Sequence, residues 1–172
     1  MATILPVKES FPYIAEDTFL APNCTIVGEV TIGEHCSVWF NAVVRGDVNY
    51  IKIGNYSNIQ DNVTIHGTYL KNGTEIGNYV NIGHNAIIHG CKIEDYVLIG
   101  MGSIVMDKAI IESKVIIAAG AVVLENMRCE SGYLYAGVPA KKIKPLTEEQ
   151  MALLNNLPHN YVMYSSWFSN QK

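Results

Sequence analysis

The sequence IQDNVTIHGTYLKNGTEIGNYVNIGHNAIIHGC, from Ile59 to Cys91, carries three of the five histidines, His66, His84 and His89. Aliphatic residues recur through it every six residues, with one insertion. The same spacing continues outward, so that sixteen units in four blocks open with Ile26, Ile32, Val38, Val44; Ile53, Ile59, Ile65; Ile76, Ile82, Ile88; and Ile93, Ile99, Val105, Ile111, Ile117, Val123. A fixed six-residue period predicts a parallel β-helix, in which each unit forms one side of a triangular coil.

A second column of small or β-branched residues lies two positions before each of these aliphatic residues. Because side chains alternate along a strand, both columns are expected to point into the prism. Three cysteines, Cys24, Cys36 and Cys91, fall in this second column, which predicts buried free thiols. Cys129 lies past the last of these units, and the sequence predicts no role for it.

The chain is expected to form one structural domain with three parts. Residues 1–22 lack the period and contain three prolines, which suggests an extended N-terminal cap. Residues 23–124 form the β-helix. Residues 125–172 form a return segment and C-terminal helices that pack on the prism.

Two short helices are expected near the C-terminus. The spacing TEEQ at Thr147–Gln150 is typical of a capping box and predicts a helix from about Glu148 to Leu157, ended or kinked by Pro158. A second helix, from about Asn160 to Phe168, carries aromatic residues largely on one face, which we expect to pack against the prism or an adjoining chain.

The composition limits the class of protein. The chain has 172 residues, 49% of them hydrophobic and 16% charged, with a net charge of −4 and a pI near 5.7. The acidic balance argues against nucleic-acid binding. No apolar run approaches the length of a membrane span, and no cleavable signal is evident at the N-terminus, so we expect a cytoplasmic protein that does not contact a membrane.

The histidines fall at defined places in the six-residue register. Units three apart stack one turn above each other, about 4.8 Å apart. His66 follows Ile65, and His89 follows Ile88 three units later, so the two imidazoles are predicted to stack at one corner and to bind one metal ion. His84 lies one side of the prism away.

Only a neighbouring chain can therefore bring a third histidine, His84, to the metal bound by the other two. A heterologous contact between prism edges closes into a ring, which predicts a homotrimer with metal sites shared between chains. Three histidines and one open position are typical of a catalytic zinc site. Arg45 shares the column of His66 and Asp61 shares that of His84, so Arg45 and Asp61 are expected to form an ion pair between chains beside the site.

Five motifs resemble the gamma-class carbonic anhydrase family of left-handed β-helix proteins. They are RGD at Arg45–Asp47, NIQDN at Asn58–Asn62, VTIHG around His66, IGHNAIIHGC through His84 and His89, and AGVPAKKIK at Ala136–Lys144. The last motif is shared more broadly with hexapeptide-repeat acyltransferases. The resemblance implies an all-β, left-handed parallel β-helix with a C-terminal α-helix, assembled as a trimer.

The resemblance also implies roles for individual residues. His66 and His89 of one chain and His84 of its neighbour would bind Zn²⁺, with Fe²⁺ or Co²⁺ as alternative occupants. Gln60 would hydrogen-bond the metal-bound hydroxide, which attacks carbon dioxide and gives bicarbonate. Further roles are implied for Asn58 in orienting carbon dioxide, for Asp47 in supporting the interface, and for Tyr161 at the pocket.

Two departures from the family pattern predict slow hydration. Val48 stands where some members carry a glutamate, and the short loop Thr68–Thr74 lacks an acidic proton shuttle.

Two other functions remain open. One is a hexapeptide acyltransferase that uses coenzyme A or an acyl carrier protein, with a histidine as general base. The other is a non-catalytic metal-binding trimeric scaffold.

Overall fold

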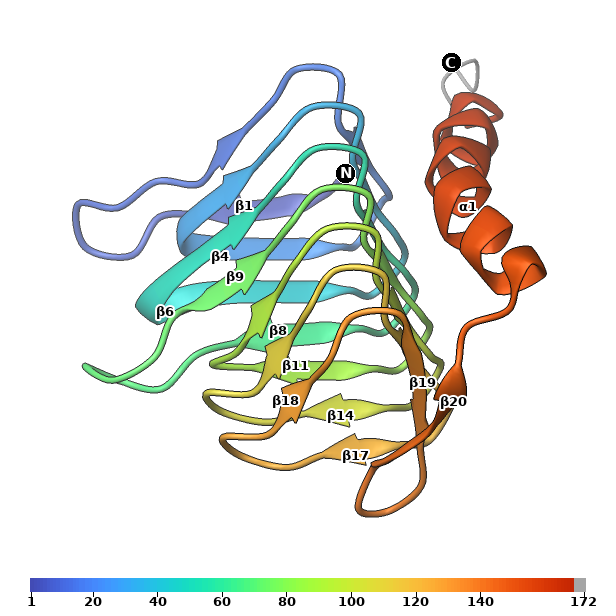
Figure 1. The fold of residues 1–172 in the computed structure, drawn as a ribbon. Coiled ribbons are helices and arrows are strands. Elements are labelled where there is room, and N and C mark those ends of the chain that lie inside the picture. The colour runs from blue at the N-terminus through green and yellow to red at the C-terminus, as the bar shows by residue number, and fades with distance from the viewer. Residues whose placement is uncertain (169–172) are drawn as a thin grey trace.

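The computed structural model describes residues 1–168 as a left-handed parallel β-helix of about seven turns with one C-terminal helix (Figure 1). The expected β-helix and C-terminal α-helix are confirmed. Short strands form the sides of each coil, and strands of successive coils pair in parallel. The prism is therefore a stack of triangles, and its corners form continuous edges.

Two sheets line the three faces of the prism. The 12-stranded sheet contains β1 (Thr3–Leu5), β2 (Tyr13–Ile14), β4 (Thr25–Ile32), β6 (Val43–Ile53), β8 (Thr64–His66), β9 (Thr74–Ile76), β11 (Ile87–His89), β12 (Lys92–Ile93), β14 (Ile104–Val105), β15 (Ile110–Ile111), β17 (Val122–Val123) and β18 (Arg128–Cys129). The 8-stranded sheet, here called the helix face, contains β3 (Phe19–Leu20), β5 (Ser37–Val38), β7 (Asn58–Ile59), β10 (Asn81–Ile82), β13 (Leu98–Ile99), β16 (Ile116–Ile117), β19 (Tyr133–Ala136) and β20 (Lys141–Pro145).

The larger sheet covers two faces because β4 and β6 continue around the corner between them. The first half of β6 pairs with β8 on one face, and its second half pairs with β9 on the next. The corner lies inside β6, at Arg45–Asp47. This bend is the reason that the RGD motif projects at an edge of the prism.

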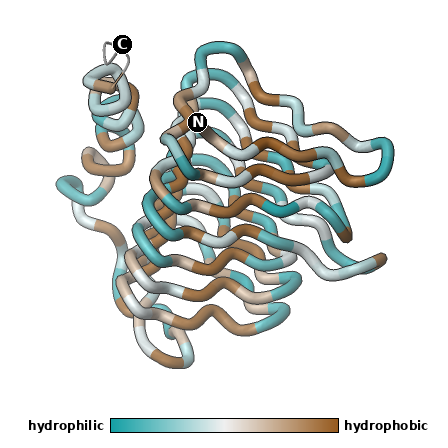
Figure 2. Tube along the Cα trace, turned by 180° about the vertical axis from the view of Figure 1, so that it is seen from behind, coloured by the Kyte–Doolittle hydropathy of each residue, from teal (hydrophilic) through white to brown (hydrophobic). Residues whose placement is uncertain are grey.

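The two predicted inward columns form the core. Ile65 and Ile88 pair directly in adjacent coils, and both are fully buried. Figure 2 shows hydrophobic segments recurring along the faces of successive coils, with hydrophilic segments at many corners. Cys24, Cys36 and Cys91 are buried free thiols, as predicted.

The prism extends further at both ends than the expected range of 23–124. At its start, β1 and β2 pair with β4, and β3 pairs with β5. At its end, β18 pairs with β15 and β19 pairs with β16. The six-residue spacing itself continues outward in both directions, through Ile14 and Leu20 before Ile26, and through Cys129 and Tyr135 after Val123. Cys129 thus occupies an inward position and is fully buried.

A single helix, α1 (Glu148–Ser166), replaces the two expected helices. The capping box is confirmed, because the Thr147 side chain accepts a hydrogen bond from the backbone N–H of Gln150 and the Gln150 side chain accepts one from the N–H of Thr147. Pro158 lies inside the helix, where the missing N–H and the ring normally favour a break. Leu154 and Pro158 are four residues apart on one face and both are buried, so packing offsets this cost.

The helix runs back along the prism, so that its C-terminal end lies beside the N-terminal coils (Figure 1). Trp39, beside β5, packs against the rings of Tyr161 and Phe168, each at a centroid distance of 5.7 Å. Trp167 is 64% exposed, so only part of the predicted aromatic face contacts the prism. Within residues 1–168, no helix combines the length and the apolar character that a membrane span requires.

Candidate metal centre

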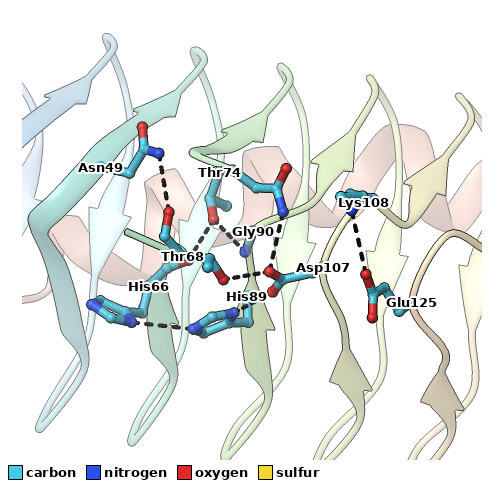
Figure 3. A network of polar contacts seen from close by, with 10 residues as sticks. Asn49, His66, Thr68, Thr74, His89, Gly90, Asp107, Lys108 and Glu125 are labelled. Atoms are coloured by element: carbon cyan, nitrogen blue, oxygen red, sulfur yellow. Dashed lines mark hydrogen bonds and ion pairs between the residues drawn. The ribbon is translucent and has the colours of Figure 1, made fainter. Parts of the chain in front are cut away.

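Two histidines lie together at the corner that follows β8, β11 and β14, here called the first edge. His66 and His89 end β8 and β11 and are direct partners in the parallel register. His66 Nδ1 lies 3.2 Å from His89 Nε2, and the ring centroids are 5.2 Å apart. The predicted stacking of this histidine pair is confirmed, and Figure 3 shows both rings projecting from the same edge.

A carboxylate engages the other nitrogen of each ring. Asp47 Oδ1 lies 2.9 Å from His66 Nε2, and Asp107 Oδ1 lies 2.5 Å from His89 Nδ1. Burial acts to raise the pKa of both carboxyl groups, but hydrogen bonds from surrounding donors outweigh it and hold both pKa values below the ordinary value. Both groups are therefore ionised near neutral pH and can only accept hydrogen bonds.

The RGD corner of β6 presents Asp47 to the histidine pair. Arg45 forms an ion pair with Asp47 in the same chain, through Oδ2, the oxygen that does not face His66. Gly46 is required between them because a Cβ there would lie 2.5 Å from the carbonyl oxygen of Glu29 in the preceding coil. Asp47 thus joins Arg45 to the histidine pair.

The third histidine of the predicted site, His84, lies at the corner that follows β7 and β10, here called the second edge. His84 Nδ1 lies 2.7 Å from Asp61 Oδ2, and the two side chains are 42% and 33% exposed. Asn62 and Asn85 turn the chain at this edge in the left-handed conformation, with φ of 59° and 58°, which asparagine tolerates well. In residues 1–168 of one chain, no three His, Cys, Asp or Glu side chains are grouped to hold a metal ion.

A chain of amide groups runs beneath the second edge on the helix face. The amide nitrogen of Gln60 donates to Asn58 Oδ1 at 3.1 Å, and Asn58 donates in turn to the side-chain oxygen of Asn81. All three side chains are buried, with exposed fractions of 5%, 1% and 0%. Because Gln60 uses its nitrogen in this chain, its carbonyl oxygen is left to accept a hydrogen bond from outside. Asn81 Nδ2 is buried without a partner in the described residues.

Tyr161 of α1 comes close to the second edge. Burial, together with electrostatic repulsion from Asp61 and Tyr164, raises the pKa of its phenol to about 12. Tyr161 therefore remains protonated at neutral pH and can donate a hydrogen bond.

Of the residues proposed from the sequence, the first edge gathers His66, His89, Arg45 and Asp47, and the second gathers His84, Asp61, Gln60, Asn58 and Tyr161.

Sequence reasoning missed the polar residues around His89. Asp107 also accepts hydrogen bonds from the Thr68 hydroxyl and from Asn72 Nδ2, the latter at 3.1 Å. The register contained a signal for Asp107, because it lies two residues after Val105, three units after Ile88. Thr68 and Asn72 belong to the insertion that interrupts the period, where the register assigns no position.

Known proteins match both the six-residue repeats and the chain as a whole. A family model described as bacterial transferase hexapeptide (six repeats) matches residues 11–46 and 90–125. A carbonic anhydrase of Geobacillus kaustophilus is 39% identical over 165 residues, which cover 96% of this chain and 90% of that protein. The mitochondrial gamma carbonic anhydrase 2 of Arabidopsis thaliana is 38% identical over 167 residues, covering 93% of this chain. The chain spans only 59% of the length of that relative.

Solved structures share the whole fold. The crystal structure of a hexapeptide transferase family protein from Anaplasma phagocytophilum has a TM-score of 0.93 and 38% sequence identity. The match covers 96% of this chain and 98% of the other.

Proposed function

Because this chain belongs to the gamma-class carbonic anhydrase family of hexapeptide-repeat proteins, we propose that it catalyses the reversible, metal-dependent hydration of carbon dioxide to bicarbonate at a site between neighbouring chains. The proposal draws on the arrangement of the two edges. It extends to Zn²⁺ as the metal and to a homotrimer as the assembly.

The main support for the proposal is the pair of nitrogens that face each other, His66 Nδ1 and His89 Nε2. Asp47 and Asp107 are acceptors, so His66 Nε2 and His89 Nδ1 are the nitrogens that donate to them, and in the neutral rings that metal binding requires the other nitrogen of each ring carries no proton. The two nitrogens that face each other at 3.2 Å then both present lone pairs, which repel unless a cation lies close to both. Two ligands on a tetrahedral zinc with Zn–N bonds of about 2.0–2.1 Å would be about 3.3–3.4 Å apart. The pair and its two carboxylates therefore fit a metal ion.

The third ligand would be His84 of a neighbouring chain. It lies on the second edge, and residues 1–168 of a single chain group no three ligands together. Contact between the first edge of one chain and the second edge of the next would complete the ligand set in every interface of a closed ring. The same contact would bring Arg45 toward Asp61 of the next chain, while Asp47 holds Arg45 in position.

A divalent metal at this site would lower the pKa of its bound water to about 7 and so supply hydroxide near neutral pH. Gln60 offers its free carbonyl oxygen as an acceptor at the edge, with its orientation held by Asn58. Both amide atoms of Asn58 are engaged and the residue is 1% exposed, which favours a supporting role for Asn58 over direct contact with carbon dioxide. Tyr161 would donate a hydrogen bond beside the second edge.

The proposal is tested by stopped-flow measurement of carbon dioxide hydration on protein of known metal content. We expect activity that depends on zinc or iron, that is slow, and that His89→Ala abolishes. His35→Ala, which removes a histidine that pairs with Asp17 between β4 and β5, away from both edges, serves as the matched control. A fully metallated wild-type protein without hydration activity would refute the proposed reaction.

Acyl transfer is the second candidate, and one observation favours it: the Anaplasma phagocytophilum structure, which this chain matches over 98% of that protein's chain, is described as a hexapeptide transferase family protein. In this function a histidine would act as general base toward an acyl acceptor. Calorimetric titration with acetyl coenzyme A discriminates the two, because a carbonic anhydrase requires no such ligand. Saturable binding that His66→Ala or His84→Ala weakens would favour the transferase.

A further inference from the structure

Asp107 forms the centre of a hydrogen-bond network behind His89, and the proposed reaction does not account for it. It follows β14 on the first edge, one turn after His89. One carboxylate oxygen faces His89 Nδ1 at 2.5 Å, and the other accepts from the Thr68 hydroxyl and from Asn72 Nδ2. Figure 3 shows Thr68, from the insertion loop, and His89, from β11, beside Asp107.

The insertion loop is closed on itself and tied to both histidine strands. The backbone N–H of Thr68 donates to the carbonyl oxygen of Asn72 at 2.9 Å, which closes the loop. The hydroxyl of Thr74, where the loop ends, donates to the backbone oxygen of His66 at 2.5 Å and accepts from the N–H of Gly90 at 3.0 Å. The loop therefore contacts the strand of each histidine.

Glycine at position 90 leaves room for this network. Gly90 has a φ of +54°, and a Cβ at this position would lie 2.8 Å from Asp107 Oδ1. A larger residue would thus displace the carboxylate from His89. The local backbone is suited to a carboxylate directly behind the imidazole.

We propose that Asp107 is a positioning residue of the metal centre: it holds His89 with Nε2 directed at His66, and the Thr68–Asn72 loop fixes Asp107 in turn. The inference rests on the proposed function. A carboxylate that accepts from Nδ1–H leaves the lone pair of the imidazole on Nε2, where a metal can bind. Substitution of such an outer partner typically weakens metal binding by about 10–100-fold.

An ion pair between Lys108 and Glu125 on the same edge provides a comparison with an ordinary surface contact. Lys108 Nζ lies 3.5 Å from Glu125 Oε1, and both side chains are about half exposed, at 51% and 50%. The Asp107 side chain is 21% exposed and has three hydrogen-bond partners. Glu125→Gln is therefore a matched control, because it changes a carboxylate nearby that does not touch the histidine pair.

The test measures metal binding to the metal-free protein of 172 residues. Zinc affinity is determined by competition with a chromophoric chelator, and the visible absorption of bound Co²⁺ reports the geometry of the ligands. We expect Asp107→Ala to weaken zinc binding about 10–100-fold and to change the Co²⁺ spectrum. Asp107→Asn, which keeps the shape, is expected to weaken binding less, and Glu125→Gln to leave affinity and spectrum unchanged. Circular dichroism of the metal-free variants checks that they are folded.

Coupling between the loop and Asp107 is tested with Thr68→Val, which removes the hydroxyl donor and keeps the size. If Thr68 acts through Asp107, Thr68→Val weakens zinc binding in the wild-type background but has no further effect in Asp107→Ala. Additive losses would refute the role of the loop.

The outcomes separate this inference from the proposed function. Wild-type protein that binds cobalt while Asp107→Ala and Asp107→Asn bind it with unchanged affinity and spectrum overturns the inference alone. Wild-type protein that binds metal with the expected dependence on Asp107, but does not hydrate carbon dioxide, overturns the reaction and leaves the inference standing. Wild-type protein that binds no metal overturns both.

Discussion

Replacement of Ile88 by alanine tests whether the aliphatic column forms the core. Ile88 is fully buried and stacks between Ile65 and Val105 in the adjacent coils. The change removes three carbon atoms, worth about 2.4 kcal/mol at about 0.8 kcal/mol per buried group. The residual cavity raises the expected loss in free energy of unfolding to about 3–4 kcal/mol, within the range of about 2–5 kcal/mol for such substitutions.

Ile87 provides the control because the same chemical change is made one residue away, on the outward face. Ile87 is 42% exposed, so Ile87→Ala is expected to cost about 1.4 kcal/mol from the remaining burial and to leave no enclosed cavity. Thermal and urea unfolding of dilute, metal-free protein measures both values, and dilution limits any contribution of contacts between chains. For Ile88→Ala the midpoint should fall by roughly 6–16 °C. A loss below about 1 kcal/mol for Ile88→Ala would refute the inward position of this column.

Four further predictions follow from contacts elsewhere in the chain. Arg45→Ala should weaken association, because it removes the cation proposed to pair across the interface; unchanged sedimentation on dilution would count against that pair. Thr147→Ala removes the cap of α1 and should lower the free energy of unfolding by about 0.5–2 kcal/mol, whereas Thr147→Ser should retain most of it. Because the pKa of Asp107 is lowered in the folded protein, Asp107 stabilises the fold above the ordinary carboxyl pKa, and this contribution is lost as the pH falls through the pKa of the folded state. Asp107→Asn should therefore flatten the loss of stability below about pH 4. Wild type and variant that lose stability equally in acid would contradict this. Burial raises the pKa of Cys91 to about 12, so its thiol should resist a disulfide reagent at pH 8 until the chain unfolds, and rapid labelling of the folded protein would exclude the buried position.

The sequence alone was sufficient to predict the coils and the histidine pair. The register counts repeat units, so the insertion between Ile65 and Ile76 does not alter the pairing of His66 with His89. The ends of the prism were harder to predict. Ile14 and Leu20 are in phase with the later units, but nearby prolines favoured an extended lead-in.

The six-residue pattern does not predict the side-chain networks around the site. Asp107 meets Thr68 through a loop whose conformation the period does not define. Asn81 occupies an outward position that would ordinarily face solvent, yet it is fully buried on the helix face, where α1 lies. Periodicity specifies which way a strand residue points, but not which distant segment covers it. The continuity of α1 through Pro158 likewise depends on packing against the prism.

The most direct test of the shared metal site is complementation between two variants that each lack one edge. Equal amounts of His84→Ala and His89→Ala chains are unfolded, mixed, refolded and freed of loosely bound metal, and zinc is then measured per chain. Neither variant alone should retain zinc. In the mixture, a site is intact where the first edge of a His84→Ala chain meets the second edge of a His89→Ala chain, which occurs in about one quarter of randomly formed interfaces. A site shared between chains predicts about one quarter of the wild-type zinc content; a mixture that retains none, or a His84→Ala protein that retains all of it, would contradict it.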